Sequence, residues 1–405
     1  MKKYRVLIVL LLALSALALL PVHAQDKKTP GYYFERGEQS MAKKEYISAQ
    51  AHFTECIRLD PYFAEAYRLR GMVREQLGEK AKALTDFNVY VDLKPDNAEV
   101  LFERALLRFE AQQWIPARQD FLKLLTLSPG ETNIVRYSQE KYNEGSVRIT
   151  TRHSDAKDYI YNYLGLCESN IRRFTQALAW MDSAVKVAPD NPLYLINRSQ
   201  VRSKASDNRG ALADLQKALE LDPENGLALH NLALLKQSGG DTEASEKLLT
   251  DAISKNERLP YPRAQRAYQR LEKNDLKGAL EDYDEVIRLD PLDAENFVNR
   301  GIVKEKMHDL AGAATDFSKA IELDSKNPKA WLGHGNVQSK LARWKEAIAD
   351  YSTALHLSPD YSLALYNRGI ARTNAGLYKE ACEDITAAAK SGVKVDAAIR
   401  LKACK

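Results

Sequence analysis

The stretch YNRGIARTNAGLYKEACEDI, residues 366–385, holds the features that decide the fold. A small residue, Gly369, and a large apolar residue, Ile385, lie sixteen positions apart, and each directly follows a charged residue, Arg368 or Asp384. A glycine lets two helices approach closely, and a large side chain fills the space beside it. The stretch therefore predicts two antiparallel helices in tight contact, with a cation and an anion next to the contact.

The same features recur with a period of 34 residues, in ten repeats that begin at residues 30, 64, 98, 158, 192, 226, 260, 294, 328 and 362. The eighth place of each repeat is Gly, Ala or Ser, and the twentieth is Ala or Ser. The twenty-fourth place is a large apolar residue such as Phe53, Leu215 or Tyr351, and seven repeats carry proline at the thirty-second place. Stacked units of this kind bury their core only between neighbours.

On these motifs the chain resembles the tetratricopeptide repeat family. The aromatic residue at the fourth place adds to the resemblance and is found as Tyr33, Tyr67, Tyr161, Phe297 and Trp331. The resemblance implies an all-α, right-handed superhelical solenoid of ten helix pairs, with a concave groove lined by the first helix of each pair. Residues 30–131 then hold repeats 1–3, residues 158–395 hold repeats 4–10, and residues 396–405 form a C-terminal capping helix.

Charged residues at the seventh and twenty-third places vary together. Six repeats carry both, as Arg70 with Asp86, Arg104 with Asp120, Arg198 with Asp214, Arg266 with Asp282, Arg300 with Asp316 and Arg368 with Asp384. Two repeats replace both, with Leu164 and Trp180 or with Leu232 and Leu248, and two keep one charge, as Arg36 with His52 and His334 with Asp350. We predict a half-buried salt bridge between the helices of one repeat, with ligand binding as the alternative role.

Asparagines occupy the sixth place of four repeats, as Asn197, Asn231, Asn299 and Asn367. An amide both donates and accepts hydrogen bonds, so a row of amides can bind the backbone of an extended peptide. The row is similar to the asparagine ladder in the repeat region of O-linked N-acetylglucosamine transferase, although Tyr163, Gln265 and Gly333 interrupt it. Aromatic residues on the first helices, Tyr261 and Tyr366 among them, are candidates for flanking pockets. The alternative is that the amides bond to neighbouring repeats and the aromatic residues belong to the core.

The repeats are interrupted by an insertion, TNIVRYSQEKYNEGSVRITTRHSDAK, residues 132–157. Its first half is compatible with a short helix and SVRITT with an extended stretch, or the whole with a hairpin about residues 143–145. An insertion of this length is often functional, and an adapter between two stacks is the alternative. Arg136, Arg148 and Arg152 could hold an anionic partner.

The N-terminus has the layout of a secretory signal peptide, residues 1–24. Lys2, Lys3 and Arg5 precede an apolar run that ends at Pro21, and the expected cleavage site is Ala24–Gln25. An uncleaved membrane anchor is the alternative, but the run is shorter than the ~20 residues that span a bilayer. Removing the three cations lowers the net charge from +4 to about +1, which gives no electrostatic footprint for nucleic acid.

The four cysteines contain no Cys-x-x-Cys pair. Cys382 and Cys404 lie on either side of the turn at residues 391–392, so we predict a disulfide that ties down the terminal helix. Cys56 and Cys167 are expected to be buried free thiols.

The chain carries no recognisable catalytic, phosphate-binding or metal-ligand motif, so we expect neither an enzyme nor a cofactor. The sequence predicts an exported, periplasmic scaffold of bacterial type that binds a peptide segment or a partner helix in its groove and does not insert in the membrane after cleavage. Two alternatives remain: a structural component that uses its convex face or ends, and a non-catalytic subunit of an envelope enzyme complex.

Overall fold

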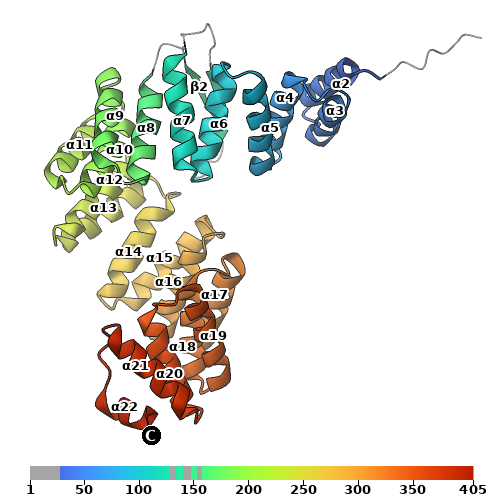
Figure 1. Ribbon diagram of the computed structural model, residues 1–405. Coiled ribbons are helices and arrows are strands. Elements are labelled where there is room, and N and C mark those ends of the chain that lie inside the picture. The colour runs from blue at the N-terminus through green and yellow to red at the C-terminus, as the bar shows by residue number, and fades with distance from the viewer. Residues whose placement is uncertain (1–27, 128–133, 140–146, 153–156, 405) are drawn as a thin grey trace, which may run out of the picture. The chain divides into compact units, whose positions relative to one another are not determined.

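The computed structural model describes residues 28–127, 134–139, 147–152 and 157–404, so the predicted signal peptide lies outside the described residues. The chain forms two compact units, residues 1–134 with 152–177 and residues 135–151 with 178–405, and each is described by itself. Both consist of helices that follow one another in antiparallel pairs (Figure 1). The fold class predicted from the 34-residue period is therefore confirmed.

Seven helices lie wholly in the first unit: α2 (Pro30–Ala42), α3 (Tyr46–Leu59), α4 (Ala64–Gln76), α5 (Lys80–Leu93), α6 (Ala98–Glu110), α7 (Trp114–Thr126) and α8 (Asp158–Asn170). Helix α9 (Phe174–Val187) crosses the division between the units. The second unit holds α10 (Pro192–Lys204), α11 (Asn208–Leu221), α12 (Gly226–Ser238), α13 (Thr242–Lys255), α14 (Pro260–Glu272), α15 (Leu276–Leu289), α16 (Ala294–Lys306), α17 (Leu310–Leu323), α18 (Pro328–Lys340), α19 (Trp344–Leu357), α20 (Ser362–Asn374), α21 (Tyr378–Lys390) and α22 (Ala397–Ala403).

All ten first helices begin on the first residue of a predicted repeat. The preceding residue often caps the helix, because the side chains of Asn97, Asn225 and Asn327 accept hydrogen bonds from backbone N–H groups of the first turn. The fifteenth place of every repeat has a left-handed backbone, which turns the chain between the two helices. Glycine fits this place at Gly78 and Gly376. In repeat 6 the turn residue is Gly240.

The small eighth residue touches the large residue at place twenty-four. A Cβ atom on Gly71 would lie 2.5 Å from Cε1 of Phe87, and one on Gly335 would lie 2.7 Å from Cε1 of Tyr351. Successive first helices also pack on one another, as α10 does on α12 and α16 on α18. These first helices form the inner layer of the second unit, with direct contacts from α10 to α12 and from α14 through α20.

The structure places the two residues of all six predicted Arg–Asp pairs within hydrogen-bonding distance. Their shortest N–O distances are 2.6–2.8 Å, between the helices of one repeat. A second cation, at the eleventh place, was missed by sequence reasoning, and it reaches the same aspartate as Arg74, Arg108, Arg202, Arg270, Lys304 or Arg372. In repeat 9 the pair is His334 Nδ1 and Asp350 Oδ2, 2.8 Å apart.

The insertion contains two paired strands, β1 (Ile134–Gln139) and β2 (Val147–Arg152), so the hairpin alternative is correct and the short helix is wrong. The turn at residues 143–145 lies outside the described residues, and the side chains of the three insertion arginines are not described. At the other end of the chain a disulfide joins Cys382 to Cys404 and holds α22. None of the described helices is long and apolar enough to cross a membrane.

The ion-pair geometry predicts which of two substitutions in repeat 8 lowers the free energy of unfolding more. Asp316 is 3% exposed and binds both Arg300 and Lys304, whereas loss of Arg300 leaves Lys304 on the carboxylate. We expect Asp316→Leu to lower the free energy of unfolding by about 3–5 kcal/mol, because it leaves two half-buried cations. Arg300→Leu should cost about 1–2 kcal/mol, and the double variant should recover much of the loss caused by Asp316→Leu. Urea denaturation followed by circular dichroism measures all three. An Arg300→Leu variant less stable than Asp316→Leu would contradict this ranking.

Candidate functional site

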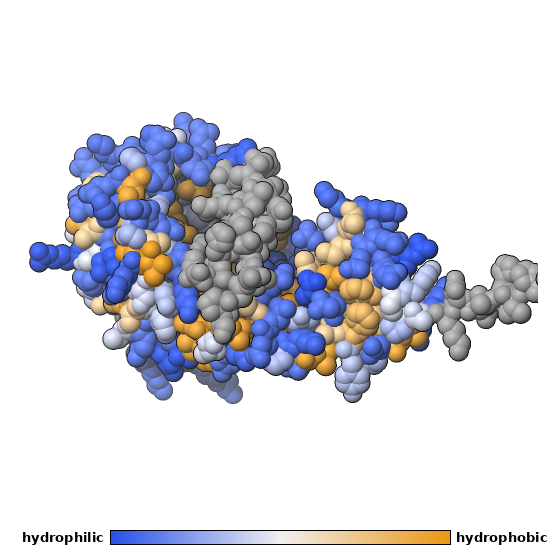
Figure 2. All heavy atoms as spheres, turned by 90° about the horizontal axis from the view of Figure 1, so that it is seen from above, coloured by the Kyte–Doolittle hydropathy of each residue, from blue (hydrophilic) through white to orange (hydrophobic). Residues whose placement is uncertain are grey.

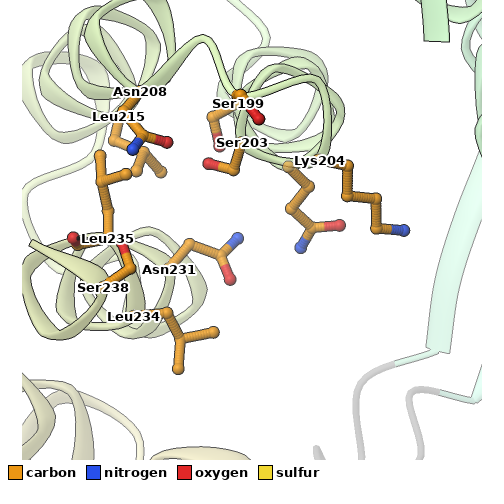
Figure 3. A pocket seen from close by; sticks show the side chains of 11 residues that line it. Ser199, Ser203, Lys204, Asn208, Leu215, Asn231, Leu234, Leu235 and Ser238 are labelled. Atoms are coloured by element: carbon orange, nitrogen blue, oxygen red, sulfur yellow. Dashed lines mark hydrogen bonds between the residues drawn. The ribbon is translucent and has the colours of Figure 1, made fainter.

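A cavity of about 490 Å³ opens between the first helices of repeats 5 and 6 in the second unit (Figure 3). Helix α10 contributes hydroxyl and amide groups and one lysine, α12 contributes an amide and two leucines, and the start of α11 closes one side. Its lining residues are Ser199, Gln200, Ser203, Lys204, Ser206, Asn208, Leu215, Asn231, Leu234, Leu235 and Ser238. The cavity thus lies on the inner layer, where the sequence predicted a groove.

The cavity coincides with a leucine at the twenty-fourth place of repeat 5. In repeat 8 the ring of Phe317 occupies the twenty-fourth place and lies against both Gly301 and Gly333 of the next repeat. The same place in repeat 5 is Leu215, a smaller side chain that lines the cavity together with Ser199. An aromatic ring would fill part of this space, so the leucine leaves it to a ligand.

Asn231 is the best-placed binding group in the cavity. Its side chain is 8% exposed and points into the space between α10 and α12 (Figure 3). Its Nδ2 is buried and has no hydrogen-bond partner. A buried donor without a partner costs about 1–3 kcal/mol, which an acceptor atom of a ligand would recover.

The rest of the cavity combines acceptors with apolar surface. Ser199 Oγ donates to the Ile196 carbonyl at 2.7 Å and Ser238 Oγ donates to the Leu235 carbonyl at 2.8 Å, so both hydroxyl oxygens keep lone pairs for a ligand donor. Lys204 is the one charged side chain in the lining, and no carboxylate lines the cavity. The cavity therefore suits a neutral or anionic group and disfavours a cation.

The predicted asparagines divide into two groups. Asn367 Nδ2 donates to Asn336 Oδ1 at 2.9 Å, and the Tyr351 hydroxyl donates to the same oxygen at 3.0 Å, so this amide bonds to the neighbouring repeat. Asn197 also interacts within the protein. Asn299 is half-buried and lies on a first helix, as Asn231 does. Neither of these two side chains donates a hydrogen bond to another described residue. The groove interpretation therefore concentrates on repeats 6 and 8.

Aromatic and apolar side chains border this part of the inner layer. Tyr261 is 48% exposed and Tyr268 46% exposed, both on α14, and Leu234 is exposed on α12. The buried Tyr283 hydroxyl has no hydrogen-bond partner, and burial raises its pKa. Tyr366, the other predicted aromatic residue, is partly buried against Ala381, Ile385 and Ala403 at the C-terminal cap, which favours the core interpretation for this residue. Hydrophilic side chains cover most of the face in Figure 2, with small hydrophobic groups between them.

The cavity was not predicted from the sequence, although Ser199 and Leu215, which line it, occupy the eighth and twenty-fourth places of repeat 5. Repeat 5 pairs Ser199 at the eighth place with Leu215 at the twenty-fourth, where repeats 1, 2, 8 and 9 pair glycine with an aromatic ring. Repeats 4, 6 and 10 also lack the ring, with Met181, Leu249 and Ile385, so the twenty-fourth place alone does not locate the cavity. No pattern in the repeats shows which asparagines keep an unpaired donor, since that depends on neighbours such as Asn336.

These observations define the chain as an α-helical solenoid repeat protein. The family model described as Tetratricopeptide repeat matches residues 42–98 and 332–392. The two matched ranges agree with the ten in-phase helix pairs, which pack like those of a tetratricopeptide repeat solenoid, an architecture that supports a protein-interaction scaffold.

Similar proteins carry varied names. DnaJ homolog subfamily C member 3 of Homo sapiens is 23% identical over 256 residues, 63% of this chain and 48% of that protein. Protein O-mannosyl-transferase TMTC3 of Homo sapiens is 23% identical over 236 residues, 55% of this chain and 26% of that protein. The crystal structure of YrrB, a TPR protein with an unusual peptide-binding site, has 20% identity and a TM-score of 0.40, and it covers 47% of this chain and 96% of that one. The chain spans about half or less of the length of these two curated relatives.

The pKa of His230, the residue before Asn231, tests whether this part of the inner layer is as buried as the structure shows. Burial lowers the pKa of His230 to about 4, and its Nδ1 is buried without a partner. The unfolded chain takes up a proton below about pH 6.5, and the folded chain only near pH 4, so folding stability falls by about 3 kcal/mol over that range. NMR titration of histidine-labelled protein should give His230 a pKa below about 5, and His230→Phe should remove this part of the pH dependence. A midpoint at 6 or above would show that His230 is solvated.

Proposed function

We propose that the chain is a non-catalytic scaffold that holds an extended peptide segment of a partner protein along the first helices of repeats 5–8. The observation that carries the proposal is the buried, unpaired Nδ2 of Asn231, which points into a cavity on the inner layer. A peptide carbonyl is the acceptor that every partner segment carries, whatever its side chains.

The spacing of the repeats supports an extended segment. Neighbouring first helices lie about 9 Å apart when they pack directly, and an extended chain rises about 3.3 Å per residue. Equivalent groups on successive helices would thus meet about every third residue of the peptide. Asn231 and Asn299 are two repeats apart, so they would bind carbonyls about six residues apart.

The side chains around the cavity define the middle of the segment. Leu234 lines the cavity and Tyr261 lies beside His230, the neighbour of Asn231, so both offer exposed apolar or aromatic surface near the amide. The cavity itself contains a lysine and no carboxylate. We therefore propose a segment with apolar side chains and without a positive charge at the residue that enters the cavity.

The location of the scaffold is part of the proposal. The N-terminal layout of Lys2, Lys3 and Arg5 before an apolar run supports export, with the periplasm of a bacterial cell as the destination. The scattered histidines and the absence of a catalytic motif in the sequence support a non-catalytic role.

Alanine substitutions at the three asparagines test this binding mode. A ligand is first selected from a displayed library of 12-residue peptides with the full chain as bait, and its affinity is measured by isothermal titration calorimetry. We expect Asn231→Ala and Asn299→Ala each to weaken binding about tenfold, since each removes a donor to a peptide carbonyl. Asn367→Ala is the matched control, because that amide already bonds to Asn336, and its affinity should stay within about twofold of wild type.

Circular dichroism of each variant shows that the fold is retained. Equal losses in all three variants, or none in Asn231→Ala, would contradict binding at this part of the groove.

A further inference from the structure

The disulfide between Cys382 and Cys404 lies in the wall of a second open cavity, of about 680 Å³, at the C-terminal end of the second unit. Tyr378, Lys379, Glu383, Thr386, Ala387 and Lys390 line it together with the two cysteines. Cys404 is exposed and Cys382 is partly exposed. Exposed disulfides tend to have higher reduction potentials than covered structural ones, and they are the labile or regulatory class.

The other two cysteines have the opposite environment. Cys56 and Cys167 are free thiols with fully buried side chains, and burial raises the pKa of Cys56 to about 11 and that of Cys167 to about 12. Such thiols are inert in the folded chain because the reactive thiolate is suppressed. Exchange chemistry is therefore confined to one place, Cys382–Cys404.

We propose that this disulfide is a site of thiol–disulfide exchange that controls whether α22 stays docked. The substrate class is a thiol or dithiol reductant small enough, or carried on a loop narrow enough, to enter the cavity. This inference is independent of the groove and holds whatever the groove binds.

The reaction begins at Cys404, the more exposed of the two residues. A thiolate attacks Sγ of Cys404, a mixed disulfide forms there, and the electron pair of the broken S–S bond leaves with Sγ of Cys382 as a thiolate. A second thiol of the reductant then attacks the mixed disulfide and releases the Cys404 thiolate, so the protein gains two electrons and the reductant becomes a disulfide. A monothiol stops at the mixed disulfide on Cys404.

The cavity lining stabilises the thiolate that leaves when this disulfide is attacked. Lys379 and Lys390 line the same cavity, against one carboxylate, Glu383. Positive charge stabilises a thiolate, and a thiol with lower pKa leaves faster. Cys382 is also the fifth residue of α21, on the N-terminal half of the helix.

Release of the bond loosens α22, which is too short to be stable alone. The helix has seven residues, and Ala403 packs on Ala381 and Ile385 of α21, with Val395 and Ile399 at the edge. One side-chain hydrogen bond adds to this, from Lys402 Nζ to Asn374 Oδ1 at 3.2 Å. Figure 1 shows α22 at the end of the stack beside α20 and α21.

Undocking reaches the inner layer through Tyr366. This side chain packs on the same cluster as α22 and lies on α20, the first helix of the last repeat. Reduction would therefore uncover Ile385 and free Tyr366, next to Asn367, in one step. The proposed exchange thus changes the end of the surface that the first helices form.

The test uses the full folded chain without denaturant. It is incubated with glutathione or with dithiothreitol, quenched in acid, alkylated and mapped by mass spectrometry. We expect glutathione to add at Cys404 and leave Cys382 free to be alkylated, while Cys56 and Cys167 remain unmodified. An adduct on Cys382 in place of Cys404, or reduction that occurs only in denaturant, would overturn the proposal.

Hydrogen exchange tests the consequence for α22. In Cys404→Ser, which cannot form the bond, amides of residues 397–403 and 381–388 should exchange about tenfold faster or more than in the oxidised wild type. Amides of repeats 5 and 6 serve as the internal control and should be unchanged. Equal protection of α22 in the variant and wild type would show that the disulfide does not control docking.

The role of the lysines has its own matched control. Lys379→Gln with Lys390→Gln should slow the attack by glutathione about threefold, because the leaving thiolate loses its cations. Lys345→Gln, on α19 and outside the cavity, should leave the rate unchanged. Equal rates in all three proteins would remove the lysines from the proposal, and an increase in rate in the double variant would contradict the assigned leaving group.

Discussion

The rest of the structure depends on contact between the small eighth residue and the large twenty-fourth residue of each repeat. Where these are glycine and an aromatic ring, as in Gly71 with Phe87, a Cβ atom on the glycine would overlap the ring. This contact fixes the distance between the two helices of a repeat. It also fixes the gap to the next repeat, because the ring of Phe317 reaches Gly333 as well. A repeat that changes either residue changes the surface between two first helices, and repeat 5 does so with Ser199 and Leu215.

Charge pairs add geometric specificity to this apolar packing. In six repeats the aspartate at the twenty-third place binds an arginine of its own repeat, and the same arginine reaches back to a side chain of the preceding repeat. Arg300 Nη1 lies 2.8 Å from Asp284 Oδ1, and Arg198 Nη1 lies 2.9 Å from Asp182 Oδ1. The hydrogen bond to the Asp316 carboxylate raises the pKa of Arg300, so the guanidinium stays charged. Hydrogen bonds that need a defined geometry hold neighbouring repeats in register more specifically than apolar contact alone.

Most of the fold could be predicted from the sequence because the repeats share the same packing contact and, in most copies, the same charge pair. Ten copies show which places vary together, and this covariation located the contacts of Arg70 with Asp86 and of Arg368 with Asp384. It missed the second cation, since Lys304 and Arg372 could equally have been solvated residues. The candidate site was only partly predictable: Asn231 and Asn367 occupy the same place, yet one amide is unpaired and the other bonds to Asn336. Hydrogen bonding of an amide depends on its three-dimensional neighbours, which the repeat pattern does not encode.

In repeat 5 the leucine at the twenty-fourth place leaves space on the inner layer that an aromatic ring would fill. The double variant Ser199→Ala with Leu215→Phe recreates the alanine–phenylalanine pair of repeat 3, Ala105 with Phe121, inside repeat 5. Calorimetry with the selected peptide, on a variant shown by urea denaturation to be as stable as wild type, measures the effect on binding. We expect the double variant to lose at least tenfold in affinity, about 1.4 kcal/mol, because the ring occupies the cavity. Wild-type affinity in a stable, ring-filled variant would contradict this expectation.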